Sequence, residues 1–167
     1  MKYWKTLEND MAPFPVLNRA LSGSRITELA HFVDRIVIPY GPDKVFIYAG
    51  SNDIQGRKPR TPEQVLNGFR LFCDRVHNEL PETKIFFISI SPTPSRIRWK
   101  HWPAVQMANR LIKDFCEEDE RLHFIDTTDK FLNDLGKPRS ELFKIDGIHM
   151  NRKGYEIWTS MLRPLLD

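Results

Sequence analysis

Apolar runs rich in β-formers alternate along the chain with stretches in which apolar residues recur at helical spacing. The runs cover residues 44–49, 85–90 and 122–125. The first is unbroken, which is typical of a strand buried on both faces of a parallel sheet. Strands that alternate with helices indicate βαβ units. The pattern therefore predicts an α/β fold, a three-layer α/β/α sandwich with a mostly parallel sheet.

The helices are predicted from apolar residues that share one face, and three of them have a start signal. The sequence Thr-Pro-Glu-Gln at 61–64 combines a capping box with proline at the first helical position. Asn151 is the expected N-cap of the last helix, and Ser24 that of the first. The four predicted apolar stripes lie at 26–36, 65–76, 105–115 and 157–165.

Two assignments rest on shorter patterns. Residues 15–17 are predicted to form a short strand ahead of the first helix, and the chain from the end of the 85–90 strand through Trp102 is predicted to be a loop. We found no internal repeat and no low-complexity segment. A chain of 167 residues fits one compact domain, 1–167, with a sizeable core.

The charge balance narrows the classes of partner. The chain has 25 basic and 22 acidic residues, a net charge of +3 that gives little reason to expect a polyanion. No apolar stretch approaches the roughly 20 residues of a membrane span. Cys73 and Cys116 are predicted to be buried free thiols on helix faces. Free thiols are typical of the reducing cytoplasm, which is the favoured location, and a secreted protein is the alternative.

The residues that suggest chemistry follow the predicted strands. Asp146 precedes His149 by three residues on one short loop, a spacing at which the carboxylate can hold the imidazole tautomer through Nδ1 and leave Nε2 as a base. Asn52 and Gly23 can supply a side-chain amide and a backbone N–H to an oxyanion. The alternative is that these residues form a loop hydrogen bond and ordinary turns without chemistry.

These segments resemble the SGNH hydrolases, the GDSL esterase/lipase family. Residues 18–24 resemble its second block, Gly-Ser-Asn-Asp at 50–53 its third and Asp-Gly-Ile-His at 146–149 its fifth. The resemblance spans nearly the whole chain and implies a flavodoxin-like hydrolase fold. It implies backbone Gly23 and side-chain Asn52 as oxyanion donors, His149 as general base and Asp146 as its orienter. It implies no metal and no organic cofactor.

The family's first block, which carries the nucleophilic serine, has no counterpart in these residues. We hypothesise that Met1 lies just past that serine and that the first strand, between those near Val16 and Val45, is missing too. Without that strand, backbone N–H and C=O groups of its neighbours would lack hydrogen-bond partners. Each such buried group lowers the stability of the fold by about 1–3 kcal/mol. As an alternative, another serine could act as the nucleophile, and the candidates are Ser22, Ser24 and Ser51.

The resemblance implies a carboxylic ester hydrolase that acts on a small-molecule ester by serine acyl transfer. The chain has no long insertion for a lid over a lipid tail, so short, acetyl-like acyl groups are expected. The alternative is a catalytically inactive hydrolase-like domain that binds a ligand or partner. The basic and aromatic residues at 95–102 suggest a third class, a nucleic-acid binder, but we favour a substrate rim anchored by tryptophan and expect no nucleic-acid partner.

Overall fold

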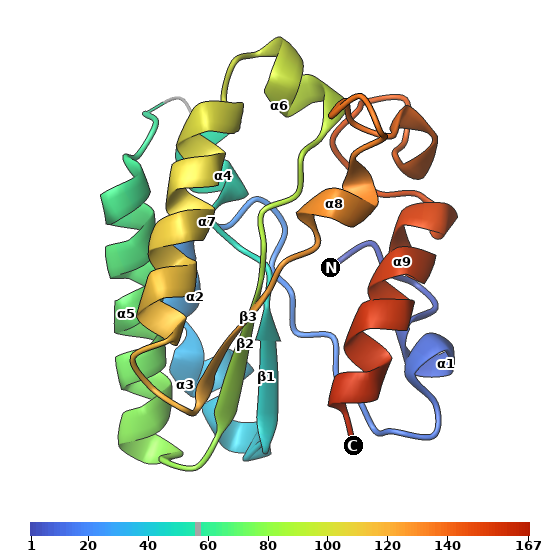
Figure 1. Cartoon of the computed structure of the whole chain (residues 1–167). Helices are drawn as coiled ribbons and strands as arrows, with labels where there is room; N and C mark the ends of the chain where they lie inside the picture. The colour runs from blue at the N-terminus through green and yellow to red at the C-terminus, as the bar shows by residue number, and fades with distance from the viewer. Residues whose placement is uncertain (56–57) are drawn as a thin grey trace. The chain divides into compact units, whose positions relative to one another are not determined.

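A computed structural model of the chain describes residues 1–55 and 58–167 (Figure 1). The chain forms two compact units, each built from separate parts of the sequence. The sheet unit comprises residues 21–90 and 101–126, and the terminal unit comprises residues 1–20, 91–100 and 127–167. Each unit is described by itself.

The sheet unit contains a parallel sheet of three described strands in the order β1-β2-β3. These are β1 (Lys44–Ile47), β2 (Lys84–Ile88) and β3 (Leu122–Ile125). Val45 pairs with Ile85, which in turn pairs with Leu122. The strands predicted at 44–49, 85–90 and 122–125 and their parallel direction are confirmed, and so is the α/β class. Among the described residues, the outer edge of β1 pairs with no further strand.

Helices pack along one face of this sheet. The longest are α5 (Pro62–Glu79) and α7 (Trp102–Cys116), which lie side by side (Figure 1). Alternation along β2 sends Ile85 and Phe87 into the core beneath the helices. Phe86 faces the other way and stacks between Phe46 and His123, at ring-centroid distances of 4.7 and 4.5 Å.

The remaining elements of the sheet unit are short. They are α2 (Ile26–His31), α3 (Val33–Ile36), a 3₁₀ turn η1 (Ile38–Tyr40) and α4 (Ser51–Gln55). The predicted helix over 26–36 is therefore divided into α2 and α3. The break lies at Phe32, whose ψ of 8° departs from the helical range. Its inward positions still match the prediction, since Ile26, Leu29 and Val33 are buried.

The capping box predicted at the start of α5 is present. Gln64 N donates to Thr61 Oγ1 at 3.3 Å and Thr61 N donates to Gln64 Oε1 at 3.1 Å, which completes the capping box. Cys73 and Cys116 are buried free thiols, as predicted. Burial raises the pKa of Cys73 far above its usual value and that of Cys116 to about 12.

The terminal unit is built around one amphipathic helix, α9 (Arg152–Leu162). Trp4 stacks on Tyr155 with ring centroids 5.0 Å apart, and Trp158 is buried beside them. The other elements are short: α1 (Leu7–Met11), α6 (Pro94–Arg98), α8 (Thr128–Phe131), η2 (Ser140–Leu142) and η3 (Arg163–Leu165). None of the described helices is both long and apolar enough to cross a membrane.

Two of the predicted segments are wrong. Residues 15–17 are irregular and Leu17 is 65 % exposed. A strand needs a neighbour for its backbone groups, and among the described residues this segment has no ladder partner. The predicted loop before Trp102 contains α6, which Thr93 caps by accepting a hydrogen bond of 3.2 Å from Arg96 N.

Candidate active site

Asp146 and His149 meet in the terminal unit as the sequence predicts. His149 Nδ1 lies 2.8 Å from Asp146 Oδ2. The other carboxylate oxygen, Oδ1, accepts the backbone N–H groups of Ile148 at 2.8 Å and of His149 at 2.9 Å. One carboxylate therefore organises both the turn and the imidazole.

These contacts keep Asp146 ionised and select the tautomer of a neutral His149 ring. Burial opposes ionisation of Asp146, but the hydrogen bonds from the His149 ring and from the backbone of His149 and Ile148 outweigh it and lower the Asp146 pKa to about 2. An ionised carboxylate can only accept, so Nδ1 of His149 carries the proton. In neutral imidazole Nε2 is then the acceptor, as a general base requires.

The turn that carries the pair is held from a distant part of the sequence. Ser95, buried in α6, donates its hydroxyl to the Asp146 carbonyl at 2.8 Å and its backbone N–H to the Gly147 carbonyl at 3.1 Å. Gly147 has a φ of +63°, and a Cβ there would lie 3.0 Å from Ser95 Oγ. Glycine is therefore needed both for the backbone conformation and for the approach of α6.

The start of α9 fixes the other side of the turn. Asn151 accepts from Gly154 N at 3.3 Å as the predicted N-cap, and its amide donates to the carbonyls of Glu141 and Phe143. Lys144 N donates to the His149 carbonyl at 2.8 Å. His149 is thus held between a capped helix and a short backbone bridge.

An aromatic ring also packs on the imidazole. Tyr3 approaches the His149 ring edge to face, with centroids 5.0 Å apart and planes at 81°. Lys144 Nζ lies 5.1 Å from the centroid of the Tyr3 ring. The His149 and Asp146 side chains are 45 % and 43 % exposed, so both are accessible from solvent.

Asn52 and Gly23 come together in the sheet unit. Asn52, on α4, donates from Nδ2 to the Ser24 carbonyl at 2.9 Å, which fixes its amide beside the loop of Gly23. Gly23 has a φ of +74°, and no atom lies within 4 Å of where its Cβ would stand. The amide has a second N–H, so the pair offers a backbone and a side-chain donor.

Ser24 does not cap α2 as predicted, because its hydroxyl donates to the Leu21 carbonyl at 3.0 Å. Asp53 supplies the acceptor instead. Its Oδ2 receives the backbone N–H of Ile26 at 3.0 Å, while Arg60 Nε lies 3.8 Å from Oδ1. Asp53 is fully buried, and burial raises its pKa despite these contacts.

Sequence reasoning missed three residues that support these pairs: Tyr3, Asp53 and Ser95. Each contacts a segment that is distant in the sequence, so no local motif predicts its role. Within the residues that the structure describes, no group of three or more His, Cys, Asp or Glu side chains is arranged to hold a metal ion.

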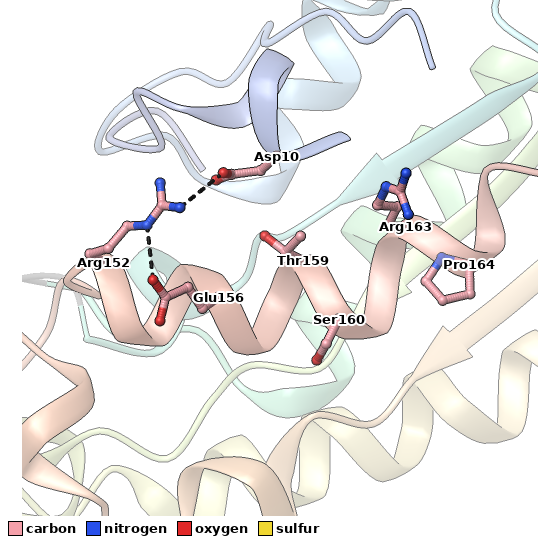
Figure 2. Close-up of a pocket in the computed structure, with 7 residues that line it drawn as sticks. All are labelled: Asp10, Arg152, Glu156, Thr159, Ser160, Arg163 and Pro164. Atoms are coloured by element: carbon pink, nitrogen blue, oxygen red, sulfur yellow. Dashed lines mark hydrogen bonds and ion pairs between the residues drawn. The ribbon is translucent and has the colours of Figure 1, made fainter. Parts of the chain in front are cut away.

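A shallow groove of about 350 Å³ lies elsewhere in the terminal unit (Figure 2). Polar side chains of α1 and α9 line most of it, and it contains neither Asp146 nor His149. The lining residues are Asp10, Arg152, Glu156, Thr159, Ser160, Arg163 and Pro164.

Residues 2–157 match the model of the GDSL-like lipase/acylhydrolase family. No protein with a curated description matches the chain. Among solved structures, the chain is similar to a candidate platelet activating factor from Streptococcus pneumonia, with a TM-score of 0.86 at 22% identity, covering 99% of this chain and 79% of that one.

Two further solved structures share this fold. One is a variant of an acetyl-xylooligosaccharide esterase from Geobacillus Stearmophilus, with a TM-score of 0.70 at 19% identity over 87% of this chain and 68% of that one. The other is the OSK domain of Drosophila Oskar, with a TM-score of 0.75 at 20% identity over 97% of this chain and 82% of that one. At these identities the likeness concerns the fold alone.

Proposed function

Because the chain belongs to the GDSL-like lipase/acylhydrolase family, we propose that it is a carboxylic ester hydrolase that cleaves short acyl esters, such as acetyl esters, by acyl transfer through a serine. The observation that carries the proposal is the Asp146–His149 pair. Its carboxylate receives three hydrogen bonds from its own short turn and leaves Nε2 of the imidazole as an acceptor.

The proposed steps use four residues of this chain. A serine oxygen attacks the ester carbonyl while its proton passes to Nε2 of His149, which then gives that proton to the departing alcohol. Asp146 accepts from Nδ1 and stabilises the imidazolium. The Gly23 backbone N–H and the second N–H of the Asn52 amide stabilise the oxyanion. Water then hydrolyses the acyl-serine by the same proton path.

In this proposal the serine precedes Met1, and residues 1–167 belong to one hydrolase domain whose first strand also precedes Met1. The outer edge of β1 supports it, because among the described residues that edge has no partner strand. An additional parallel strand paired there would satisfy its backbone groups.

An inactive hydrolase-like binding domain is the second candidate. In the described part of the chain, the His149 ring forms a hydrogen bond with Asp146 and packs against the ring of Tyr3. The likeness to the OSK domain of Drosophila Oskar also fits this alternative.

Hydrolysis of p-nitrophenyl acetate separates these candidates. We expect activity from the chain produced with the codons that precede Met1, and its loss by at least ~10³-fold in His149→Ala. His31→Ala is the matched control, because it removes an exposed imidazole from the end of α2.

Each other result has a definite meaning. Activity of residues 1–167 alone that depends on His149 would place the nucleophile within the printed sequence, with Ser22, Ser24 and Ser51 as the residues to replace next. No activity dependent on His149 in either form would contradict the esterase and favour the binding domain.

A further inference from the structure

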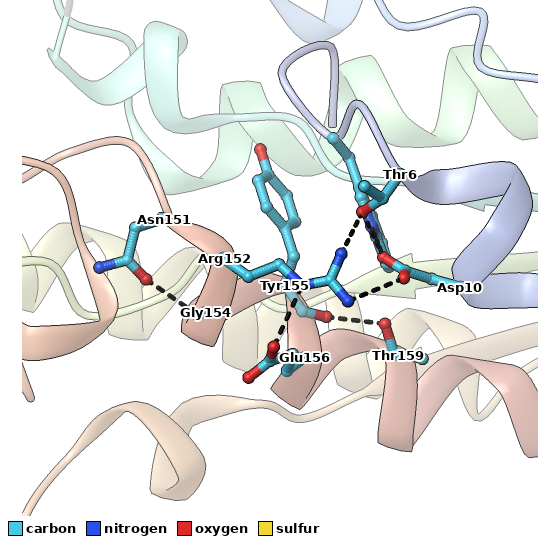
Figure 3. A network of polar contacts seen from close by, with 9 residues as sticks. Thr6, Asp10, Asn151, Arg152, Gly154, Tyr155, Glu156 and Thr159 are labelled. Carbon is cyan, nitrogen blue, oxygen red and sulfur yellow. Dashed lines mark hydrogen bonds and ion pairs between the residues drawn. The ribbon is translucent and has the colours of Figure 1, made fainter.

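A carboxylate on α1 gathers three donors from two different segments. Asp10 Oδ2 accepts the indole N–H of Trp4 at 2.7 Å and the hydroxyl of Thr6 at 2.6 Å. Its Oδ1 lies 3.2 Å from Arg152 Nη2 (Figure 3). The Asp10 side chain is only 10 % exposed. Burial opposes its ionisation, yet the contacts with Thr6, Trp4 and Arg152 lower its pKa.

Arg152 joins these contacts to the helix that follows His149. It is the first residue of α9 and stands three residues after His149. Its Nη1 donates to Thr6 Oγ1 at 2.7 Å and its Nε donates to Glu156 at 3.0 Å (Figure 3). The planar fork of a guanidinium can contact these acceptors together, which a lysine ammonium cannot do with the same geometry.

Further contacts hold the rest of the N-terminal segment, residues 1–14, on α9 and on η3 directly after it. Trp4 stacks on Tyr155, one turn after Arg152. Near the other end of the segment, Arg163 donates from Nε at 3.2 Å and from Nη2 at 2.8 Å to the Ala12 carbonyl. The Asp10–Arg152 contact lies at the end of α9 nearest to His149.

We propose that Asp10 and Arg152 form a clamp that positions the N-terminal segment against His149. Tyr3 is the residue through which the clamp acts, because it adjoins Trp4 in sequence and its ring packs on the His149 imidazole at 5.0 Å. Asp10 and Arg152 are positioning residues. Among the described residues, their hydrogen bonds and ion pairs are with Trp4, Thr6, Glu156 and each other rather than with His149.

The clamp matters for catalysis only if the proposed function holds, with its serine just before Met1. That serine would then lie a few residues from Tyr3 on the same segment. A nucleophile must stand within about an ångström of its working position for efficient catalysis. A clamp between this segment and α9 would therefore set the distance from the serine to Nε2 of His149.

The first test needs no activity. In chain labelled with ¹⁵N and ¹³C, NOE intensities between the rings of Tyr3 and His149 report their contact, and the Trp4 indole N–H reports the Asp10 bond. We expect Asp10→Asn and Arg152→Gln to weaken the NOE at least threefold and to shift the indole signal. Asp34→Asn is the matched control, because Asp34 pairs with Arg75 at 2.7 Å on an exposed surface.

A shifted indole signal with an unchanged NOE in Asp10→Asn would overturn the clamp. If Asp10→Asn does not fold, Arg152→Lys provides the same test, since it keeps the positive charge but lacks the planar guanidinium that contacts several acceptors at once. An NOE that Arg152→Lys and Arg152→Gln leave at its original intensity would also overturn the proposal.

The second test is kinetic and uses the form of the chain that hydrolyses p-nitrophenyl acetate. We expect Asp10→Asn to lower kcat at least tenfold with KM within twofold, and Asp34→Asn to change neither. An unchanged kcat in Asp10→Asn would contradict a positioning role. If no form shows activity dependent on His149, the proposed function fails, whereas the NOE still decides whether the clamp holds Tyr3 against His149.

Discussion

The hydroxyl of Ser95 donates a hydrogen bond of 2.8 Å to the backbone carbonyl of Asp146, 51 residues further along the chain. Arg98 in turn donates to the Ser95 oxygen at 3.3 Å. The shape of the Asp146–His149 turn therefore depends on α6, which contains neither member of the pair.

Replacing Ser95 by alanine should destabilise this turn. We expect Ser95→Ala to lower the free energy of unfolding by about 1 kcal/mol, because the Asp146 carbonyl loses a partner. The rate of ester hydrolysis should fall as well. Urea denaturation measures the stability, with Ser160→Ala as control, since its exposed hydroxyl donates to the Ile157 carbonyl of its own helix. Equal stabilities of the two variants would contradict the role given to Ser95.

Asp146 should make stability depend on acid pH. Its pKa is lowered to about 2 in the folded chain, below its ordinary value near 4, so the ionised form stabilises the fold. That contribution is fully present above about pH 4 and is lost as the pH falls through 2. We expect Asp146→Asn to be less stable than the original chain at pH 6. The difference between their urea midpoints should shrink by pH 2.5, and a constant difference would contradict this.

Asn52→Ala should impair the chemical step more than substrate binding. Removing one oxyanion donor typically lowers kcat about 10²–10³-fold, so we expect a loss of that order with little change in KM. Steady-state hydrolysis of p-nitrophenyl acetate measures both constants in the active form of the chain. Asn78→Ala, at an exposed position of α5, is the control. A loss confined to KM would instead assign Asn52 to ground-state binding.

Gly50 precedes Asn52 and should not tolerate a side chain. Its φ is +92°, and a Cβ there would lie 2.8 Å from Ile90 Cδ1 and 2.9 Å from Val65 Cγ1. We expect Gly50→Ala to lower the free energy of unfolding by roughly 2–4 kcal/mol, from backbone strain and overpacking together.

Gly41→Ala is the matched comparison for Gly50. The φ of Gly41 is +49°, but nothing lies within 4 Å of its Cβ position. Gly41→Ala should therefore lower the free energy of unfolding by only about 1 kcal/mol. Thermal unfolding of both variants measures the difference. If the two changes cost the same, the packing of Ile90 and Val65 around Gly50 is not what excludes a side chain.

Signals that act within a few residues could be predicted from the sequence. The Thr61 capping box needs only Gln64, and the Asn151 cap needs only Gly154. The Asp146–His149 pair is also local, since three residues separate its members. The Thr93-Pro94 start of α6 is a signal of the same kind, and it could have corrected the predicted loop.

Features that depend on distant partners could not be predicted. The segment at 15–17 has the composition of a strand, but a strand forms only where a neighbouring strand forms hydrogen bonds with its backbone N–H and C=O groups. Asp53 follows Asn52 in a turn motif, yet its carboxylate caps a helix 27 residues earlier in the chain. Sequence position gives no measure of such a distance in space.

The burial of Cys73 and Cys116 makes the chain a convenient scaffold for site-specific labelling. Maleimides and iodoacetamide react with exposed thiolates, and both native thiols are buried with raised pKa values. A cysteine introduced at an exposed position should therefore be the single fast-reacting thiol at neutral pH. A fluorophore or spin label could then be attached while both native cysteines stay in place.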